Sequence, residues 1–327
     1  MSNNNTSVTA GNNGLNNTQQ AANILQARKM ALSQLHYNAR VKSDQPCCIV
    51  LLLDQSGSMS EEVINNRGEA VQKAETLSQE INKFLNGILV KCRREDLYKN
   101  YFDILIIGYG REEDEDYEGV VLAWEGKLKG KSWVNVNDLI DTYLRKDTIE
   151  ITNTRPFGPR IIKDEYKCWI EPYAEGLTPM KKAFQFCRPY IQDWVSRNPN
   201  SFPPLIFNIT DGEVSDVDEM SELIHEANTL KSLSTSNGNA LLFNLLISDN
   251  HEQIVEFPHE HEIGLFEETE FEKAMFEASS FIPKNLIPFL PVRRSDDEPI
   301  KAITLGNLEH IFSLLNIGTT TLDNLTE

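Results

Sequence analysis

Runs of mainly apolar residues, of which 47–53 is unbroken, alternate along this chain with stretches in which apolar residues recur every three or four positions. A mainly apolar run is typical of a strand buried on both faces, and the wider spacing is typical of a helix with one apolar face. Buried strands are predicted at 47–53, 101–109, 204–210 and 239–248, with a short edge strand at 119–124. Helices are predicted at 61–89, 134–145, 179–197 and 215–231. This alternation predicts an α/β fold, with a doubly wound, mostly parallel central sheet and helices on both faces.

The flanking and inserted segments are less regular. Residues 1–20 form an Asn-rich head of low complexity that is expected to be disordered, and 21–44 have the spacing of a lead-in helix. The main domain is expected at 45–320, with an insertion at about 110–175 whose proline-broken second half, 146–175, is predicted to be an extended loop. A C-terminal helical extension is expected from about 268, with helices at 271–280 and 305–315 around a proline-rich loop at 283–299.

Polar side chains with oxygen atoms follow the first buried strand at once. The run 47–53 ends at Asp54-Gln55-Ser56-Gly57-Ser58. Alternate residues that leave a strand can point the same way, so Asp54, Ser56 and Ser58 can converge on one point. Carboxylate and hydroxyl oxygens are the donors that a hard cation such as Mg²⁺ prefers.

Two further oxygen donors are expected at the same edge of the sheet. Asp211 directly follows the strand at 204–210, and Thr178 lies where a loop enters the helix at 179–197. Open parallel sheets bind ligands at the carboxyl ends of their strands. The sequence therefore predicts a metal site made by Asp54, Ser56, Ser58, Thr178 and Asp211.

The segments DQSGSM, LTPM and ITDG, in this order on an α/β chain, resemble the metal-ion-dependent adhesion site of von Willebrand factor type A domains. The resemblance covers about 45–250 firmly and extends more weakly to about 317, where the tail is similar to bacterial intracellular members of the family. It implies that the hydroxyls of Ser56, Ser58 and Thr178 ligate the ion directly, and that Asp54 and Asp211 act mostly through water. The ion implied is Mg²⁺, or Mn²⁺ or Ca²⁺ in its place. Its open coordination position would take an Asp or Glu of a protein partner. The chain departs from the common Gly-Gly-Thr turn, because Leu177 precedes Thr178.

The family resemblance implies a binding module, not an enzyme: a scaffold or adaptor in a bacterial signalling or stress-response system, with components of a kinase and phosphatase module as candidate partners. A Mg²⁺-dependent hydrolase acting on phosphate or ester substrates is the alternative. The nucleophile motif G-x-S-x-G is absent, and no histidine is positioned in the sequence as a base for Ser56 or Ser58.

Charge and composition limit the classes of partner that the chain is expected to bind. With 49 acidic against 31 basic side chains, the formal net charge is -18, which disfavours nucleic acid. We expect a cytoplasmic protein without a membrane partner, since no signal peptide or long apolar segment is evident and the five cysteines form no C-x-x-C pair. His251, His259 and His261 lie close together among acidic residues. They leave open a zinc site, although a solvated acidic loop is the simpler interpretation.

Overall fold

The computed structural model describes residues 37–64, 69–111, 119–155, 158–212, 214–248, 254–266, 269–295 and 297–307, without the side chains of 149–162 and 164. The expected disordered head and most of the expected lead-in helix lie outside these residues. The last part of that helix, 37–44, is not helical. Tyr37 is instead buried against Phe202 and its amide donates to the Asn237 carbonyl, so the chain follows the body of the domain in an extended form.

An eight-stranded sheet has the order β15-β16-β14-β11-β1-β6-β7, and β8 also pairs with β6. The central strands β16, β14, β11, β1 and β6 are parallel, whereas β15, β7 and β8 run antiparallel to their neighbours. The strands are β1 (Cys47–Asp54), β6 (Phe102–Tyr109), β7 (Val120–Leu122), β8 (Val134–Asn135), β11 (Leu205–Thr210), β14 (Leu241–Ile247), β15 (Val255–Glu256) and β16 (Ile303–Gly306).

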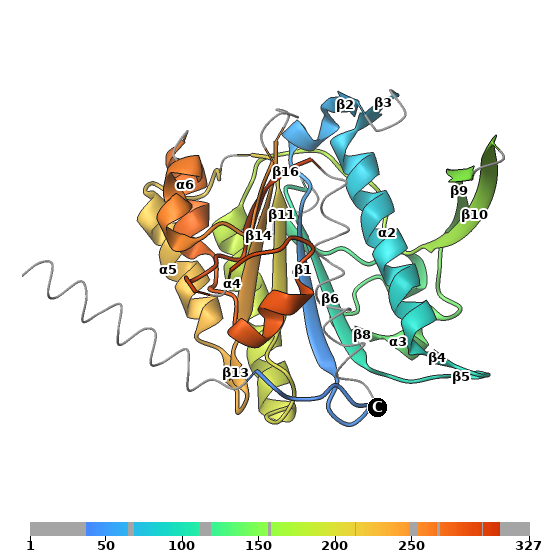
Figure 1. Ribbon diagram of the computed structural model, residues 1–327, viewed down its shortest axis with the longest axis horizontal. Coiled ribbons are helices and arrows are strands. Elements are labelled where there is room, and N and C mark those ends of the chain that lie inside the picture. The colour runs from blue at the N-terminus through green and yellow to red at the C-terminus, as the bar shows by residue number, and fades with distance from the viewer. Residues whose placement is uncertain are drawn as a thin grey trace, which may run out of the picture. The chain divides into compact units, whose positions relative to one another are not determined.

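Helices cover both faces of this sheet (Figure 1). Cys48, Val50 and Leu52 of β1 share a buried cluster with residues of α4, α5 and α6, while Leu53, which points the opposite way, lies beside the first turns of α2. The expected α/β architecture is confirmed, and it is consistent with the von Willebrand A fold that the motifs imply. The helices are α2 (Lys73–Cys92), α3 (Val136–Leu139), α4 (Met180–Arg197), α5 (Met220–Lys231) and α6 (Glu270–Ala278), with 3-10 turns η1 (Gly57–Ser60), η2 (Gly126–Leu128), η3 (Glu260–Phe266) and η4 (Lys284–Phe289).

The helix predicted at 61–89 begins later than expected. Its first residues form a hairpin of β2 (Glu62–Ile64) and β3 (Ala70–Gln72), and α2 starts only at Lys73. Val63 pairs with Val71 across this hairpin. Branched side chains such as these favour extended backbone and cross-strand contact, which outweighs the helical spacing in this segment.

The loop predicted at 146–175 is wrong over most of its length, up to Cys168. β9 (Arg145–Arg155) and β10 (Gly158–Cys168) form a long antiparallel hairpin that projects from the body (Figure 1). Pro159 lies within β10, which a two-stranded ribbon tolerates because each strand has an unshared edge. The helix predicted at 134–145 is likewise reduced to the single turn α3, since the chain passes into β9 at Arg145.

The predicted starts of two later helices also differ from the structure. The helix predicted from Ser215 begins at Met220, because Glu219 forms a capping box with Glu222 and Ser215 has another hydrogen-bonding role described below. The closing helix predicted at 305–315 is wrong at its start, where β16 adds a parallel strand beside β14; residues 308–315 lie outside the description.

Short hairpins are formed by β4 (Arg93–Arg94) with β5 (Leu97–Tyr98) and by β12 (Ser234–Thr235) with β13 (Gly238–Asn239). Among the described helices, none is long and apolar enough to cross a bilayer.

Candidate metal site

Asp54 is the last residue of β1 and its carboxylate is fully buried. The parallel register that pairs Leu53 with Ile209 brings the end of β11 alongside. One carboxylate oxygen accepts the Ser56 amide at 2.9 Å, and the other accepts the Thr210 hydroxyl at 2.6 Å. Burial raises the pKa of Asp54 to about 6, although the hydrogen bonds from Ser56 and Thr210 oppose this shift.

Ser56, Ser58 and Asp211 meet beside Asp54, as the sequence predicted. The two serine hydroxyls are 3.1 Å apart, and the Ser58 hydroxyl donates to Asp211 Oδ1 at 2.7 Å. The chain turns between the serines at Gly57, the first residue of η1, and Met59 of the same turn is buried. A continuous hydrogen-bonded cluster therefore joins the end of β1 to the loop after β11.

Thr178 belongs to a loop that is tied to the same turn. The Gly57 amide donates to the Gly176 carbonyl at 3.0 Å, and the Glu175 amide donates to the Gln55 carbonyl at 2.9 Å. Thr178 itself is only 7% exposed. The backbone contacts hold the entry to α4 against the serine turn, which brings all five predicted residues to one edge of the sheet.

Three residues at this edge were not predicted from the sequence. Ser215 Oγ accepts the Thr178 amide at 2.9 Å while its own amide donates to the Thr178 carbonyl at 3.0 Å, so Ser215 fixes the threonine and does not begin a helix. Thr210 supports Asp54. Lys73 reaches the cluster from α2 and contacts Asp211 Oδ2 at 3.0 Å and Glu61 at 2.7 Å. The helical spacing around Lys73 carries no signal of this role.

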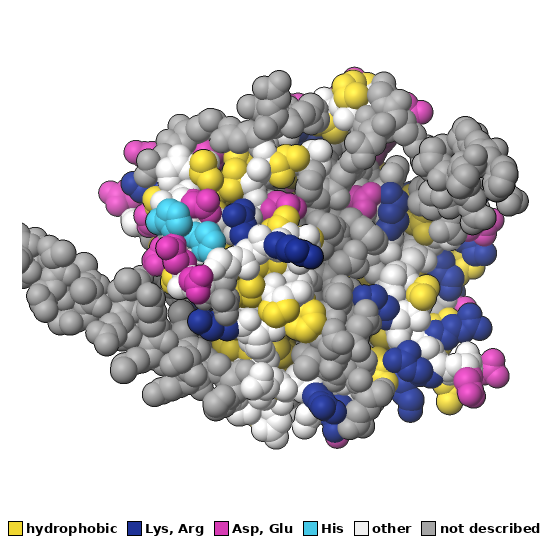
Figure 2. Space-filling model, viewed as in Figure 1, with side chains coloured by type: hydrophobic (Ala, Val, Ile, Leu, Met, Phe, Trp, Pro, Cys, Tyr) yellow, Lys and Arg dark blue, Asp and Glu magenta, His cyan; other side chains and the backbone are white. Residues whose placement is uncertain are grey.

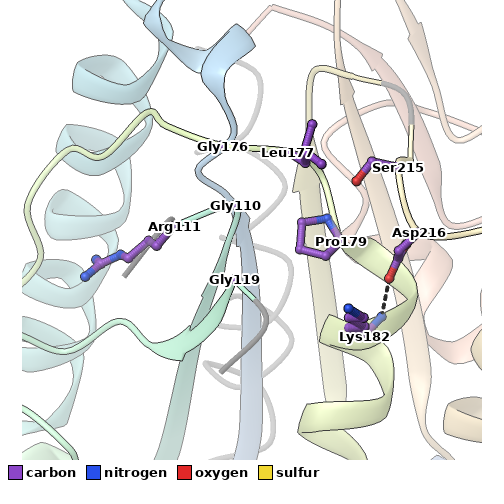
Figure 3. A pocket seen from close by; sticks show the side chains of 9 residues that line it. All are labelled: Gly110, Arg111, Gly119, Gly176, Leu177, Pro179, Lys182, Ser215 and Asp216. Carbon is purple, nitrogen blue, oxygen red and sulfur yellow. Dashed lines mark hydrogen bonds between the residues drawn. The ribbon is translucent and has the colours of Figure 1, made fainter. Parts of the chain in front are cut away.

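A hollow of about 510 Å³ opens next to the serine turn (Figure 3). Gly110 is part of its wall and lies so close to the turn that a Cβ there would be 2.5 Å from the Ser56 amide. The Arg111 side chain points away from the hollow and stacks over Tyr173, whereas Asp216 accepts the Lys182 amide on the opposite wall (Figure 3). Leu177, at the rim, is 73% exposed.

The donor set fits a hard divalent cation. Two enclosed carboxylates and three hydroxyls offer oxygen atoms only, and the buried carboxylates supply negative charge that would be costly to leave unbalanced. No group of three or more His, Cys, Asp or Glu side chains that could hold a metal occurs in the described part of the chain. The candidate site therefore depends on its serine and threonine oxygens.

The histidine alternative gains no support. His259 and His261 stack with ring centroids 5.7 Å apart, and His261 pairs with Glu298, whereas His251 lies outside the described residues. Figure 2 shows histidine side chains next to acidic ones on the face in view. Within the described ranges this cluster does not have a metal-binding arrangement.

Comparison with known proteins finds similarity among solved structures. No protein-family model matches it, and no curated protein matches it. Two solved structures of proximal thread matrix protein 1 from the mussel byssus, one with a zinc-occupied MIDAS motif, align at 13% identity with TM-scores of 0.39 and 0.40. Each alignment covers 86% of this chain and 48% of that one, so this chain spans about half the length of the protein it matches. Similarity at this level carries no functional argument.

Proposed function

We propose that this chain binds a divalent cation, Mg²⁺ or Mn²⁺ or Ca²⁺ in its place, and uses it to bind an acidic residue of a protein partner. The observation that supports this most strongly is the cluster in which Ser56, Ser58 and Asp211 are joined by hydrogen bonds of 3.1 and 2.7 Å beside the buried Asp54. Asp211 belongs to a segment that is remote in sequence from the turn of Ser56 and Ser58, and the parallel register of β1 and β11 brings the two together.

The chemistry of the donors explains the binding role. The hydroxyls of Ser56, Ser58 and Thr178 are neutral, so an ion that they hold keeps much of its positive charge. Mg²⁺ requires six oxygen ligands in near-octahedral geometry, and a partner carboxylate would supply one that the chain does not. Asp54 and Asp211 orient the two serines through the contacts described above, and they balance the charge of the ion without occupying every position around it.

The surroundings suggest how a partner would approach. The hollow beside the serine turn has exposed Leu177 on its rim. A partner segment that presents a carboxylate to the ion would place a neighbouring side chain in this hollow. The family resemblance extends the proposal to a cytoplasmic scaffold or adaptor in a bacterial signalling or stress-response system, with kinase and phosphatase components as candidate partners.

We favour binding over hydrolysis because the serine hydroxyls are already committed. Ser58 donates to Asp211, and among the described residues no histidine is hydrogen-bonded to Ser56 or Ser58. A nucleophilic serine needs an adjacent base that can take its proton, and Asp211, the carboxylate bonded to Ser58, is already paired with the Lys73 ammonium at 3.0 Å. The hydrolase alternative would require turnover of a phosphate or ester substrate that disappears in Asp54→Ala.

Capture of partners from native lysate tests the proposal. The wild-type chain should retain a protein with Mg²⁺ present and release it when EDTA is added. Ser56→Ala combined with Ser58→Ala should retain nothing above background, because two ion ligands are lost. Ser60→Ala is the matched control, since Ser60 is in the same turn but its hydroxyl donates to the Gly57 carbonyl. Retention that is equal in all four samples would refute the metal-bridged mechanism.

A further inference from the structure

Lys73 is a buried cation placed directly against the candidate metal site. Its side chain is only 3% exposed, and its ammonium lies 3.0 Å from Asp211 Oδ2 and 2.7 Å from Glu61. The Asp211 side chain is completely enclosed, whereas that of Glu61 is 60% exposed. Lys73 therefore interacts more strongly with Asp211, the carboxylate of the candidate metal site, than with Glu61, whose charge is screened by solvent.

The position of Lys73 in its helix is electrostatically unfavourable. Lys73 is the first residue of α2, and the preceding Gln72 makes no side-chain capping bond. The N-terminus of a helix carries partial positive charge, so a buried lysine there opposes the helix dipole. A residue that only had to begin this helix would more favourably be neutral or acidic. Within the helix itself nothing favours a cation at this place, and its ionic partners, Glu61 and Asp211, lie outside the helix.

The contacts of Asp211 show what the lysine does. One carboxylate oxygen accepts the Ser58 hydroxyl and the other accepts Lys73, so both oxygens are held by this chain. Among the enclosed charged groups in the described part of the site, Asp54 and Asp211 carry two negative charges and Lys73 offsets one of them. A divalent ion would enter a site with a net charge close to minus one and would leave it close to plus one.

We propose that Lys73 is a positioning residue that makes cation binding and carboxylate binding depend on each other. It weakens the affinity of the site for the cation alone, because it holds Asp211 and repels a second positive charge. It strengthens binding of a carboxylate once the cation is present, because the loaded site keeps a positive charge. This inference rests on the proposed function, since it describes how the same site divides its affinity between ion and partner.

A purely structural role for Lys73 makes a different prediction. Its amide donates to the Glu61 carbonyl, and its side chain could serve only to fasten the start of α2 to the chain beside η1. In that case removal of the charge would loosen the serine turn and weaken cation binding. In the proposed role the same change strengthens cation binding, so the sign of the effect separates the two.

The test measures Mn²⁺ affinity by isothermal titration calorimetry in four variants of the full chain. Lys73→Met removes the charge and keeps most of the length, and Lys73→Arg keeps the charge. Glu61→Gln removes the negative charge beside Lys73. Lys83→Met is the matched control, because Lys83 lies on the same helix and pairs with Glu80 at 2.7 Å away from the site. Each titration is repeated at constant ionic strength with acetate in place of chloride, corrected for Mn²⁺ complexes with acetate in solution.

Lys73→Met should bind Mn²⁺ about tenfold more tightly than the wild type, as expected for loss of a like charge near a divalent ion. Acetate should tighten Mn²⁺ binding to the wild type and do so less in Lys73→Met, since coupling between two ligands is reciprocal. Lys73→Arg and Lys83→Met should resemble the wild type. Glu61→Gln should bind Mn²⁺ about twofold more weakly, a small effect because this carboxylate is exposed.

Equal or weaker Mn²⁺ binding by Lys73→Met, or tighter binding by Lys73→Arg, would overturn the role of Lys73 and leave the metal site itself intact. If Lys73→Met does not fold, tighter binding or no change in Glu61→Gln would overturn it instead. Absence of Mn²⁺ binding in the wild type and in every variant would refute the proposed function together with this inference.

Discussion

The negative charge of the Asp54 carboxylate destabilises the fold, because the side chain is buried. It is fully buried, and burial raises its pKa to about 6 from an ordinary value of 3.8. The folded state therefore binds more protons than the unfolded state between these two values. Without a bound cation, the free energy of unfolding therefore falls as the pH rises from 3.8 to about 6. The full destabilisation by the buried charge is present above pH 6.

Replacement of Asp54 by Asn should stabilise the cation-free protein. The amide oxygen can still accept the Ser56 amide, and the amide nitrogen can donate to the Thr210 hydroxyl oxygen. In EDTA at pH 7.5, urea unfolding should show a gain on the order of 1–3 kcal/mol. The gain should shrink as the pH falls towards 4 and vanish only well below the ordinary value of 3.8, where the wild-type carboxyl is protonated in both states.

The same variant should lose any stabilisation by Mn²⁺, because a neutral amide cannot balance the charge of the ion. Ser60→Ala, which changes the same turn without a charge, should behave like the wild type in both respects. A variant that is less stable than the wild type at pH 7.5, or a difference that stays constant from pH 4 to 7.5, would show that Asp54 carries no such cost.

At the residue scale, the sequence was sufficient to predict which side chains of the short motifs lie together at the sheet edge. Asp54, Ser56 and Ser58 could be identified because alternate oxygen donors follow a buried strand, and Asp211 because it follows another. Lys73 could not be identified. Its role depends on a contact with Asp211 that is remote in sequence, and a lysine inside a helical pattern normally indicates a solvated face.

At the scale of elements, the hairpin of β9 and β10 is fastened to α2 by two asparagines. Asn86 Oδ1 accepts the Lys167 amide at 3.0 Å and its amide group donates to the Lys167 carbonyl at 2.7 Å. Asn82 accepts from the Trp169 and Ile170 amides and donates to the Ile170 carbonyl. These side chains take the place of a neighbouring strand, and they hold the end of β10 before the chain enters the Thr178 loop.

Asn82→Ala should destabilise the fold by about 2–3 kcal/mol, because it leaves buried backbone donors without a partner. Asn82 is only 2% exposed, so water cannot easily replace its amide. Asn137→Ala, at an exposed position of α3, is the control and should change stability by less than about 0.5 kcal/mol. Urea denaturation with equal slopes measures both. A cost for Asn82→Ala no greater than that of the control would contradict this account of the hairpin.

The sequence predicted the four central strands and the helix α4 well and failed for the hairpins and for β16. β1, β6, β11 and β14 are rich in apolar residues, and each was predicted within a few residues. The hairpins β2–β3 and β9–β10 are two-stranded ribbons without a two-sided apolar signal, so local spacing and prolines led to a helix and a loop instead. Their conformation depends on cross-strand pairing, which a single sequence does not reveal.

On the scale of the whole molecule, the fold gathers a few enclosed charges in a strongly acidic body. The formal net charge is -18, which favours approach of a cation over long distances at low salt. The proposed acidic partner would be repelled over the same distances, and a cation bound at the sheet edge would reverse this at contact. The mostly parallel sheet makes that reversal possible, because it brings the ends of β1 and β11 to one edge.

Calorimetric titration of Mn²⁺ into the wild-type chain tests the central claim most directly, with Ser56→Ala combined with Ser58→Ala as the comparison. The account predicts one Mn²⁺ per wild-type chain, displaced by excess Mg²⁺, and no binding to the double variant. Wild-type chain that binds no Mn²⁺, or a double variant that binds it as tightly as the wild type, would contradict the claim that these residues form a divalent-cation site.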